Sequence, residues 1–361
     1  MTFAILSDIH AHAWTVFGKP GPDGVNNRLS IILAEIERAA DELVLRNGDT
    51  MVIAGDILHT RGTIDPEVLN PLRACFERVL SRGITVLAIP GNHDLKSAET
   101  SELASAIQNL EQIGVSGGSF TVFNKTTALA QPDGSTFLMV PWHNTQAGLL
   151  AALQDVVDNW GLDLAKTDVF IHAGIDGVLS NMPAHGMNHV KLGAFGFRRV
   201  FSGHYHNHKD FGNGVVSIGA TTHQNWGDVG TRAGFILADA GKIEFMPAQS
   251  PSFIDISALQ PTDWPMVAGG NYVRYRGASM TGDQVVELRQ HLHDMGALGV
   301  SVEAPRASSV SRSTAVHQAR TTEESIDAFV RDVPPADPAV KIEDVVRRSI
   351  EILNESQAVA A

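Results

Sequence analysis

Short apolar runs, five of which lead into a cluster of polar residues, are the feature that most constrains the fold of this chain. Seven runs lie in the first 250 residues, over 3–8, 51–56, 85–94, 137–143, 168–175, 199–206 and 214–220. Their length and their β-branched composition predict strands. Because amphipathic segments alternate with them, the pattern predicts an α/β fold built in layers.

Two of the intervening segments have the periodicity of amphipathic helices. After the first run, one helical face carries Leu29, Ile32, Leu33, Ile36, Ala40 and Leu43. After the third run, the same spacing recurs in Leu103, Ala106, Ile107, Leu110 and Ile113. Residues 234–247 predict a β-hairpin that turns at Asp239–Gly241.

The pattern changes near residue 250, which predicts three regions: 1–250, 251–305 and 306–361. Residues 271–277, 281–296 and 299–305 read as strand, helix and strand, so the second region is expected to be a small α+β unit. The polar segment 306–320 predicts a linker. A capping box of Thr321 and Glu324 predicts a helix start, and Ile342, Val345, Val346, Ile350 and Leu353 form the apolar face of a helix over 341–355.

Composition excludes several classes of site. The chain has no apolar run of the ~18 residues that a membrane span needs and no basic lead-in to an apolar signal core, so we expect a cytoplasmic protein without membrane contact. Cys75 is the one cysteine, so a metal site must use His, Asp, Glu or Asn. The net charge of −13 argues against wholesale attraction to nucleic acid.

The polar clusters stand at the carboxyl ends of predicted strands, where sites form in open α/β sheets. They contain Asp8 and His10; Asp56; Asn92, His93 and Asp94; His172; and His204 and His206. Asp8 and His10 are two residues apart, as are His204 and His206, so each pair can point to one side of its strand. Glycines before Asp56, Asn92 and His204 permit close approach of the backbone.

Asp, His and Asn side chains together suit borderline-hard divalent ions such as Mn²⁺, Fe²⁺ or Zn²⁺. Seven candidate ligands are too many for one ion and enough for two. Two ions about 3.5–4 Å apart, bridged by a carboxylate and a hydroxide, favour in-line attack on phosphorus. The sequence therefore predicts a binuclear centre that hydrolyses phosphate esters.

The order D-x-H, GD, GNHD, H and GHxH resembles the signature of the calcineurin-like metallophosphoesterases. That resemblance implies a four-layer αββα sandwich with a small α+β capping domain and a C-terminal helical tail. It implies that one metal is held by Asp8, His10, Asp56 and His206, and the other by Asp56, Asn92, His172 and His204. His93 is then expected to face the substrate and Asp94 to orient His93 from behind.

A narrower resemblance is to the SbcD type of DNA repair nuclease and its phage-encoded relatives. "GDILHTRGTIDP" is similar to their GDLFH segment, which implies that His59 matters for exonuclease action. "SIGATTHQNWGDVG" and "NYVRYRG" resemble later segments of the same nucleases, although the first lacks their Gly-Ser pair. The resemblance implies a Mn²⁺-dependent DNA nuclease that acts with an SMC-like ATPase of the SbcC type and forms a homodimer.

Other readings remain open. His12, close to the first ligands, is a candidate substrate contact, whereas His143, His185, His189, His208 and His223 are expected to be structural or on the surface. The linker carries three arginines that either contact DNA phosphates or are simply solvated, namely Arg306, Arg312 and Arg320. The C-terminal helix packs on its own domain or on a partner. The alternative functions are a stand-alone phosphoesterase for nucleotides, small diesters or phosphoproteins, and a docking subunit with weak chemistry.

Overall fold

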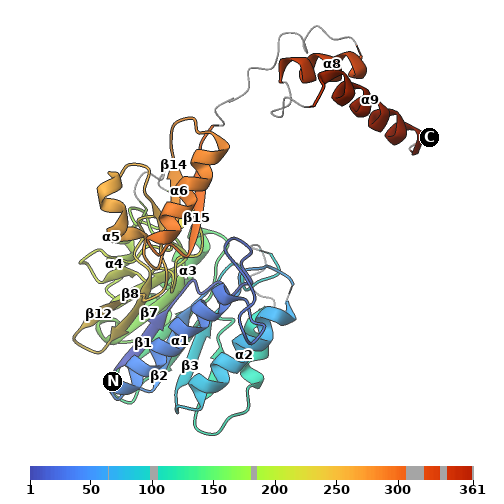
Figure 1. Ribbon diagram of the computed structural model, residues 1–361. Helices are drawn as coiled ribbons and strands as arrows, with labels where there is room; N and C mark the ends of the chain where they lie inside the picture. Colours follow the sequence, from blue (N-terminus) through green and yellow to red (C-terminus); the bar gives the residue numbers. More distant parts are fainter. Residues whose placement is uncertain (64, 98–104, 180–184, 306–320, 334–339, 360–361) are drawn as a thin grey trace. The chain divides into compact units, whose positions relative to one another are not determined.

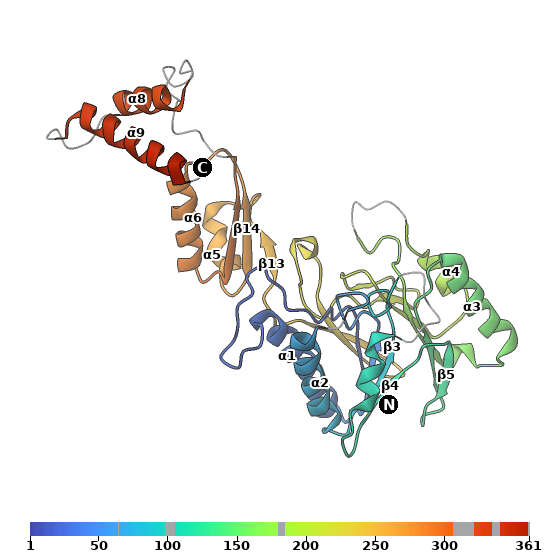
Figure 2. The same cartoon turned by 90° about the vertical axis from the view of Figure 1, so that its right-hand side faces the viewer.

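The computed structural model describes residues 1–63, 65–97, 105–179, 185–305, 321–333 and 340–359, with the backbone alone over 355–359. Two compact units result: Met1–Arg276 with Gln290–Ser301, and Gly277–Arg289 with Val302–Ala361. Figures 1 and 2 show the elements of each unit. The boundaries predicted at residues 250 and 305 remain predictions.

Two six-stranded sheets form the body of the first unit. The first has the order β12-β11-β1-β2-β3-β4 and the second the order β5-β6-β7-β8-β10-β9. The strands of the first sheet are β1 (Phe3–Leu6), β2 (Thr50–Ala54), β3 (Thr85–Ile89), β4 (Ser119–Val122), β11 (Gly234–Ala238) and β12 (Ile243–Pro247). Those of the second are β5 (Thr127–Ala130), β6 (Thr136–Val140), β7 (Thr167–His172), β8 (Arg199–Gly203), β9 (Lys209–Asp210) and β10 (Val215–Ser217).

Alternation along the strands produces the layers. Ala4 and Leu6 point to a core shared with helices α1 (Asn27–Leu45) and α2 (Pro66–Leu80), whereas Phe3 and Ile5 point to the core between the sheets. The outer face of the second sheet packs on α3 (Gln146–Asn159) and α4 (His189–Gly193). Because the side chains of a strand alternate with a period of two, each strand serves two cores. The αββα sandwich expected from the sequence is confirmed.

The predicted hairpin is also confirmed, since β11 and β12 pair antiparallel from Gly234↔Pro247 to Ala238↔Ile243. The segment after β3 differs from the expected amphipathic helix. Its described part is a 3₁₀ helix, η1 (Ala106–Gln112), which buries Ile107 and Leu110. Leu103 lies outside the described residues.

The small α+β region consists of a sheet of order β13-β14-β15 and two helices. Its elements are β13 (Phe253–Asp255), α5 (Trp264–Ala268), β14 (Tyr272–Arg276), α6 (Gly282–Asp294) and β15 (Gly299–Glu303). The Phe17 ring from the loop after β1 stacks on Tyr272 at 5.2 Å, so this sheet packs on that loop.

The second unit contains the C-terminal helices α8 (Thr322–Asp332) and α9 (Ile342–Val359). The predicted capping box of Thr321 and Glu324 begins α8. The segment 306–320, with its three arginines, lies outside the described residues. Among the described helices, none has the length and apolar character that crossing a bilayer requires.

Candidate metal centre

The polar clusters follow strands whose carboxyl ends point the same way. β1, β2 and β3 are parallel neighbours in the first sheet, and β7 and β8 are parallel neighbours in the second. The structure brings the side chains together in two groups that could each hold an ion. One contains Asp8, His10 and His206, and the other contains Asp56, His172 and His204, with ligand atoms within 4.8 Å of one another in each group.

The Asp56 carboxylate lies between the two groups. Its Oδ2 atom is 3.5 Å from Nε2 of His10 and 3.3 Å from Nε2 of His172. Ligand atoms that each stand ~2.1 Å from a common ion are roughly 3.0–3.5 Å apart, and these distances match that spacing. The position therefore suits a carboxylate shared by two ions.

Backbone carbonyls and a carboxylate orient the imidazoles. Nδ1 of His172 lies 2.7 Å from the carbonyl oxygen of Ala54, and Nδ1 of His206 lies 2.7 Å from Oδ1 of Asp228. Because a carbonyl only accepts, Nδ1 of His172 carries a proton, and Nε2 is the atom that would bind an ion once it has lost its own proton. Outer partners of this kind fix ligand imidazoles in metal sites.

Two buried atoms test whether the residues fit a metal pair. Oδ1 of Asp8 and Nε2 of His172 are among the buried polar atoms of the described residues that make no hydrogen bond, although Nε2 of His172 faces the carboxylate of Asp56 at 3.3 Å. A buried polar atom left unpaired costs ~1–3 kcal/mol, which a coordinated cation would relieve. Since one such atom belongs to each group, the donor set fits two ions.

The backbone at the candidate ligands is strained. Asp8, His10, Asp56 and His204 have φ values of 50°, 46°, 54° and 98°. Left-handed backbone at residues other than glycine costs ~1–3 kcal/mol each and gathers at functional sites. At Gly91, a Cβ atom would collide with the backbone and carboxylate of Asp56, so glycine is needed there.

The histidines of the centre divide into two electrostatic classes. Burial lowers the pKa of His10 well below its usual value and that of His204 to about 3. Burial alone would do the same to His172 and His206, but Asp56 beside His172 and Asp228 beside His206 outweigh it and raise both pKa values to about 9. Burial also opposes ionisation of Asp56, yet the facing imidazoles of His172 and His10 hold its pKa well below the ordinary range.

Asn92 and His93 enter the centre from the loop after β3. Oδ1 of Asn92 lies 3.0 Å from Nδ1 of His204, and the backbone N–H of His93 donates to Oδ1 of Asp56 at 2.8 Å. Nδ1 of His93 lies 2.5 Å from the carbonyl oxygen of His59, which leaves Nε2 of His93 available to a ligand. His10, His59 and His93 form a third group that could hold an ion.

Asp94 makes contacts other than those expected. Its buried carboxylate accepts backbone N–H groups of Gly91, Leu58 and Ile57 at 2.9, 2.9 and 3.3 Å. The carbonyl of His59, and not Asp94, pairs with Nδ1 of His93, so the expected orienting contact is corrected. Asp94 instead joins the loop after β3 to the loop after β2.

Three residues that were not predicted as site residues support the centre, namely Asp228, Gln224 and Arg28. The second carboxylate oxygen of Asp228 accepts the backbone N–H of Gln224 at 2.7 Å. The side-chain amide of Gln224 donates to the backbone carbonyl of Asp8 at 2.8 Å, and the backbone carbonyl of Gln224 accepts from the buried guanidinium of Arg28 at 2.5 Å. In the sequence, Asp228 stands out only as an acidic residue in the segment "SIGATTHQNWGDVG", which resembles the SbcD-type nucleases.

A pocket adjoins each side of the centre. On the side of His10, the ring of His59 lies 5.3 Å from His10 and 4.9 Å from His12, and His12 lines a pocket of about 150 Å³. On the other side, His204 lines a pocket of about 160 Å³ together with Trp142 and Tyr205. Substrate contact by His12 stays a prediction.

The remaining histidines divide between packing and this second pocket. His208 stacks on Phe245 at 3.9 Å, and His189 stacks on Phe211 at 4.3 Å. The ring of His223 accepts the backbone N–H of Phe253. His143 and His185, which were also expected to be structural or on the surface, line the pocket beside His204.

Solved structures match the chain at low sequence identity. The protein TT1561 of Thermus thermophilus is 12% identical with a TM-score of 0.41, and the match covers 69% of this chain and 99% of that one. A dimetal phosphatase from Danio rerio is 10% identical with a TM-score of 0.38, over 69% and 99%. The nuclease MPE of Pseudomonas putida is 13% identical with a TM-score of 0.26, over 68% and 87%. No curated protein sequence matches the chain.

The family assignment depends on the sequence match instead. The model of the calcineurin-like phosphoesterases matches residues 1–208, which is more than half of the chain. The matched segment contains both groups of candidate ligands. Members of this family use a binuclear metal centre, and the chain belongs to the calcineurin-like phosphoesterases.

Proposed function

We propose that this phosphoesterase is a Mn²⁺-dependent DNA nuclease. Asp8, His10, Asp56 and His206 would hold one ion, and Asp56, Asn92, His172 and His204 would hold the other. When bound, such a pair neutralises phosphoryl charge and supplies a nucleophilic water at neutral pH. Imidazole and carboxylate donors suit Mn²⁺, Fe²⁺ and Zn²⁺, and cleavage assays with each ion in turn would separate them.

The observation that supports a phosphodiester as the substrate is the presence of a pocket on each side of the centre. A phosphate monoester has one organic substituent, whereas a diester has two. The pocket beside His12 adjoins the group of His10, and the pocket beside Trp142 adjoins His204 of the other group. A diester whose phosphate lies between the groups can place one substituent in each pocket.

His93 is the residue best placed to handle a proton. Its backbone N–H is bound to Asp56 and its Nδ1 to the carbonyl of His59, so the ring is fixed at two points. Nε2 of His93 can therefore deliver a proton to the leaving oxygen of the ester. His59 supports DNA as the substrate, because it stands where the SbcD-type nucleases carry their additional histidine.

We further propose an SMC-like ATPase as the partner of the C-terminal helices. α8 and α9 leave Phe329 and Ile352 more than half exposed, at 54% and 53%. In a groove of about 410 Å³ within this pair, Val346 and Ile350 are bordered by polar and charged side chains, namely Arg331, Glu343, Arg347, Glu351 and Asn354. Since exposed apolar residues on paired helices are suited to a further helix, a coiled-coil segment is the expected occupant. Co-purification with the ATPase, with and without residues 321–361, tests this, and light scattering tests the homodimer.

The nuclease proposal is tested with metal-loaded protein and linear DNA. Mn²⁺ is expected to support cleavage that Asp56→Asn and His93→Ala each reduce at least 100-fold, whereas Asp41→Asn on the exposed side of α1 retains it. The net charge of −13 favours the alternative, a phosphoesterase for small substrates. Turnover of small diesters with intact DNA, alone and with the ATPase, would establish that alternative and refute the nuclease.

A further inference from the structure

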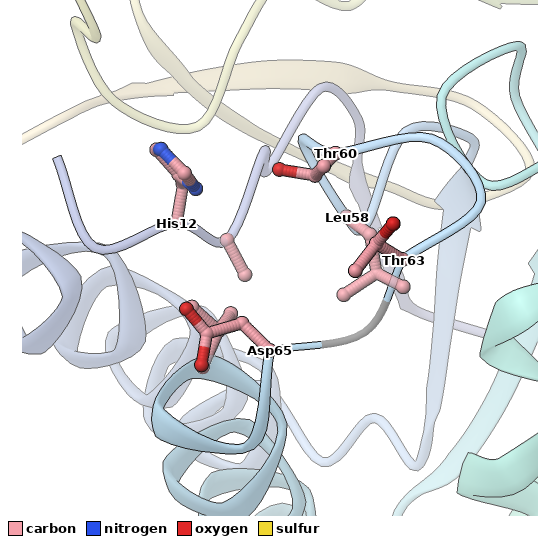
Figure 3. Close-up of a pocket in the computed structure, with 7 residues that line it drawn as sticks. His12, Leu58, Thr60, Thr63 and Asp65 are labelled. Atoms are coloured by element: carbon pink, nitrogen blue, oxygen red, sulfur yellow. The ribbon is translucent and has the colours of Figure 1, made fainter.

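We propose that the pocket beside His12 binds the neutral nucleoside part of a nucleotide whose phosphate lies at the metal centre. This inference rests on the proposed function only in placing the phosphate there. Ala11, His12, Leu58, Thr60, Thr63, Asp65 and Val68 line the pocket (Figure 3). Its volume of about 150 Å³ is below the ~300–1,000 Å³ of sites for drug-sized ligands, so within the nucleoside it is the base that the pocket suits.

The walls of the pocket are tied to the ligand-bearing loops. The backbone N–H of Ala11 donates to the backbone carbonyl of Ile57 at 2.8 Å, and the backbone N–H of His10 donates to the backbone carbonyl of Asp56 at 2.9 Å. These bonds join the loop after β1 to the loop after β2 in a parallel bridge between Ala11 and Leu58. The pocket is therefore held at a fixed position beside two of the candidate ligands.

A row of rings connects the centre to the pocket. The ring of His59 lies 5.3 Å from His10, 4.9 Å from His12 and 4.5 Å from Trp14. Flat rings of this kind are surfaces on which nucleobases stack. A nucleotide with its phosphate at the centre can thus extend across His59 into the pocket.

The chemistry of the walls selects a neutral group. Ala11, Leu58 and Val68 are apolar and buried, whereas Thr60 and Thr63, which lie on the same side of the pocket as Leu58, add hydroxyl groups (Figure 3). Asp65, which caps α2 by accepting the backbone N–H of Glu67 at 2.9 Å, adds a carboxylate. A carboxylate repels phosphate and accepts hydrogen bonds from amino and hydroxyl groups, which a nucleoside provides.

Calorimetry of the Mn²⁺-loaded full chain with 5′-dAMP and with inorganic phosphate tests the pocket without any need for catalysis. We expect 5′-dAMP to bind at least tenfold more tightly than phosphate. Thr63→Phe fills the pocket from an exposed position and is expected to reduce this ratio to less than threefold by weakening 5′-dAMP alone. Thr60→Phe, from the neighbouring position, is expected to do the same, and Thr262→Phe, an exposed threonine in the α+β region, is expected to retain the ratio.

Equal affinities for 5′-dAMP and phosphate in the unchanged protein would overturn the inference, as would an unchanged ratio in both pocket variants. Failure of the nuclease proposal looks different. If the ratio behaves as expected but DNA is not cleaved, the pocket stands and the substrate is a smaller nucleotide ester.

Discussion

Oδ1 of Asp228 lies 2.7 Å from Nδ1 of His206. Asp228 belongs to a segment that contributes no candidate ligand of its own. The other oxygen of this carboxylate accepts the backbone N–H of Gln224, whose side chain donates to the carbonyl of Asp8. One acidic side chain thus supports two members of the same ion-binding group. Substitution of Asp228 therefore distinguishes weaker metal binding from loss of a residue that acts in the chemical step.

Asp228→Asn removes this charge and keeps the size of the side chain. Loss of an outer partner typically weakens metal binding 10–100-fold, so we expect the second Mn²⁺ equivalent to bind that much more weakly. Competition with a metal indicator measures the affinity for Mn²⁺. Asp41→Asn is the matched control because the side chain of Asp41 is 61% exposed. Two unchanged affinities would show that Asp228 does not support the centre.

Arg28→Met is expected to destabilise the protein by about 2–4 kcal/mol. The guanidinium is buried and donates to the carbonyls of Val16 and Gln224 at 3.1 and 2.5 Å, and both carbonyls lose a charged partner. Urea unfolding of the metal-free protein measures the change. Arg46→Met, which breaks ion pairs of a side chain that is 33% exposed, is expected to cost less than about 1 kcal/mol. Equal costs would contradict the account of Arg28.

Metal loading at pH 7 is expected to release protons. His172 and His206, with pKa values of about 9 in the metal-free protein, are charged at pH 7 and must lose a proton to bind an ion. Burial keeps His10 and His204 neutral there, so they release none. Calorimetry in buffers of different ionisation enthalpy should report up to two protons per chain at pH 7, with the number halved near pH 9 and approaching zero at higher pH. Heats that do not depend on the buffer would contradict this.

The same two groups give the metal-free protein a pH dependence. Their folded pKa values lie above the unfolded value of 6.5, so their contribution to stability is complete below pH 6.5 and is lost as pH rises through about 9. The free energy of unfolding is therefore expected to fall between pH 6.5 and 9 without metal. Saturating Mn²⁺ should reverse that slope, because binding to the folded state strengthens as pH rises.

The sequence predicts the layers and the candidate ligands well because both depend on local periodicity. Phe3 and Ala4 face different cores as strand alternation requires, and Asp8 and His10 follow directly after β1. Asp228 was not predicted to act in the centre because its contact with His206 depends on how two loops pack. The contact between Asp94 and the backbone of Leu58 likewise spans 36 residues, which periodicity does not reveal. η1 replaces the expected α-helix, although Ile107, Leu110 and Ile113 of the expected apolar face are buried.

Counting Mn²⁺ bound per chain by equilibrium dialysis, together with the electron paramagnetic resonance spectrum of the bound ions, tests the central claim most directly. The account predicts two ions per chain with an exchange-coupled spectrum, and one uncoupled ion in His172→Ala. A single ion in the unchanged protein, or two ions without coupling, would contradict a centre shared through Asp56.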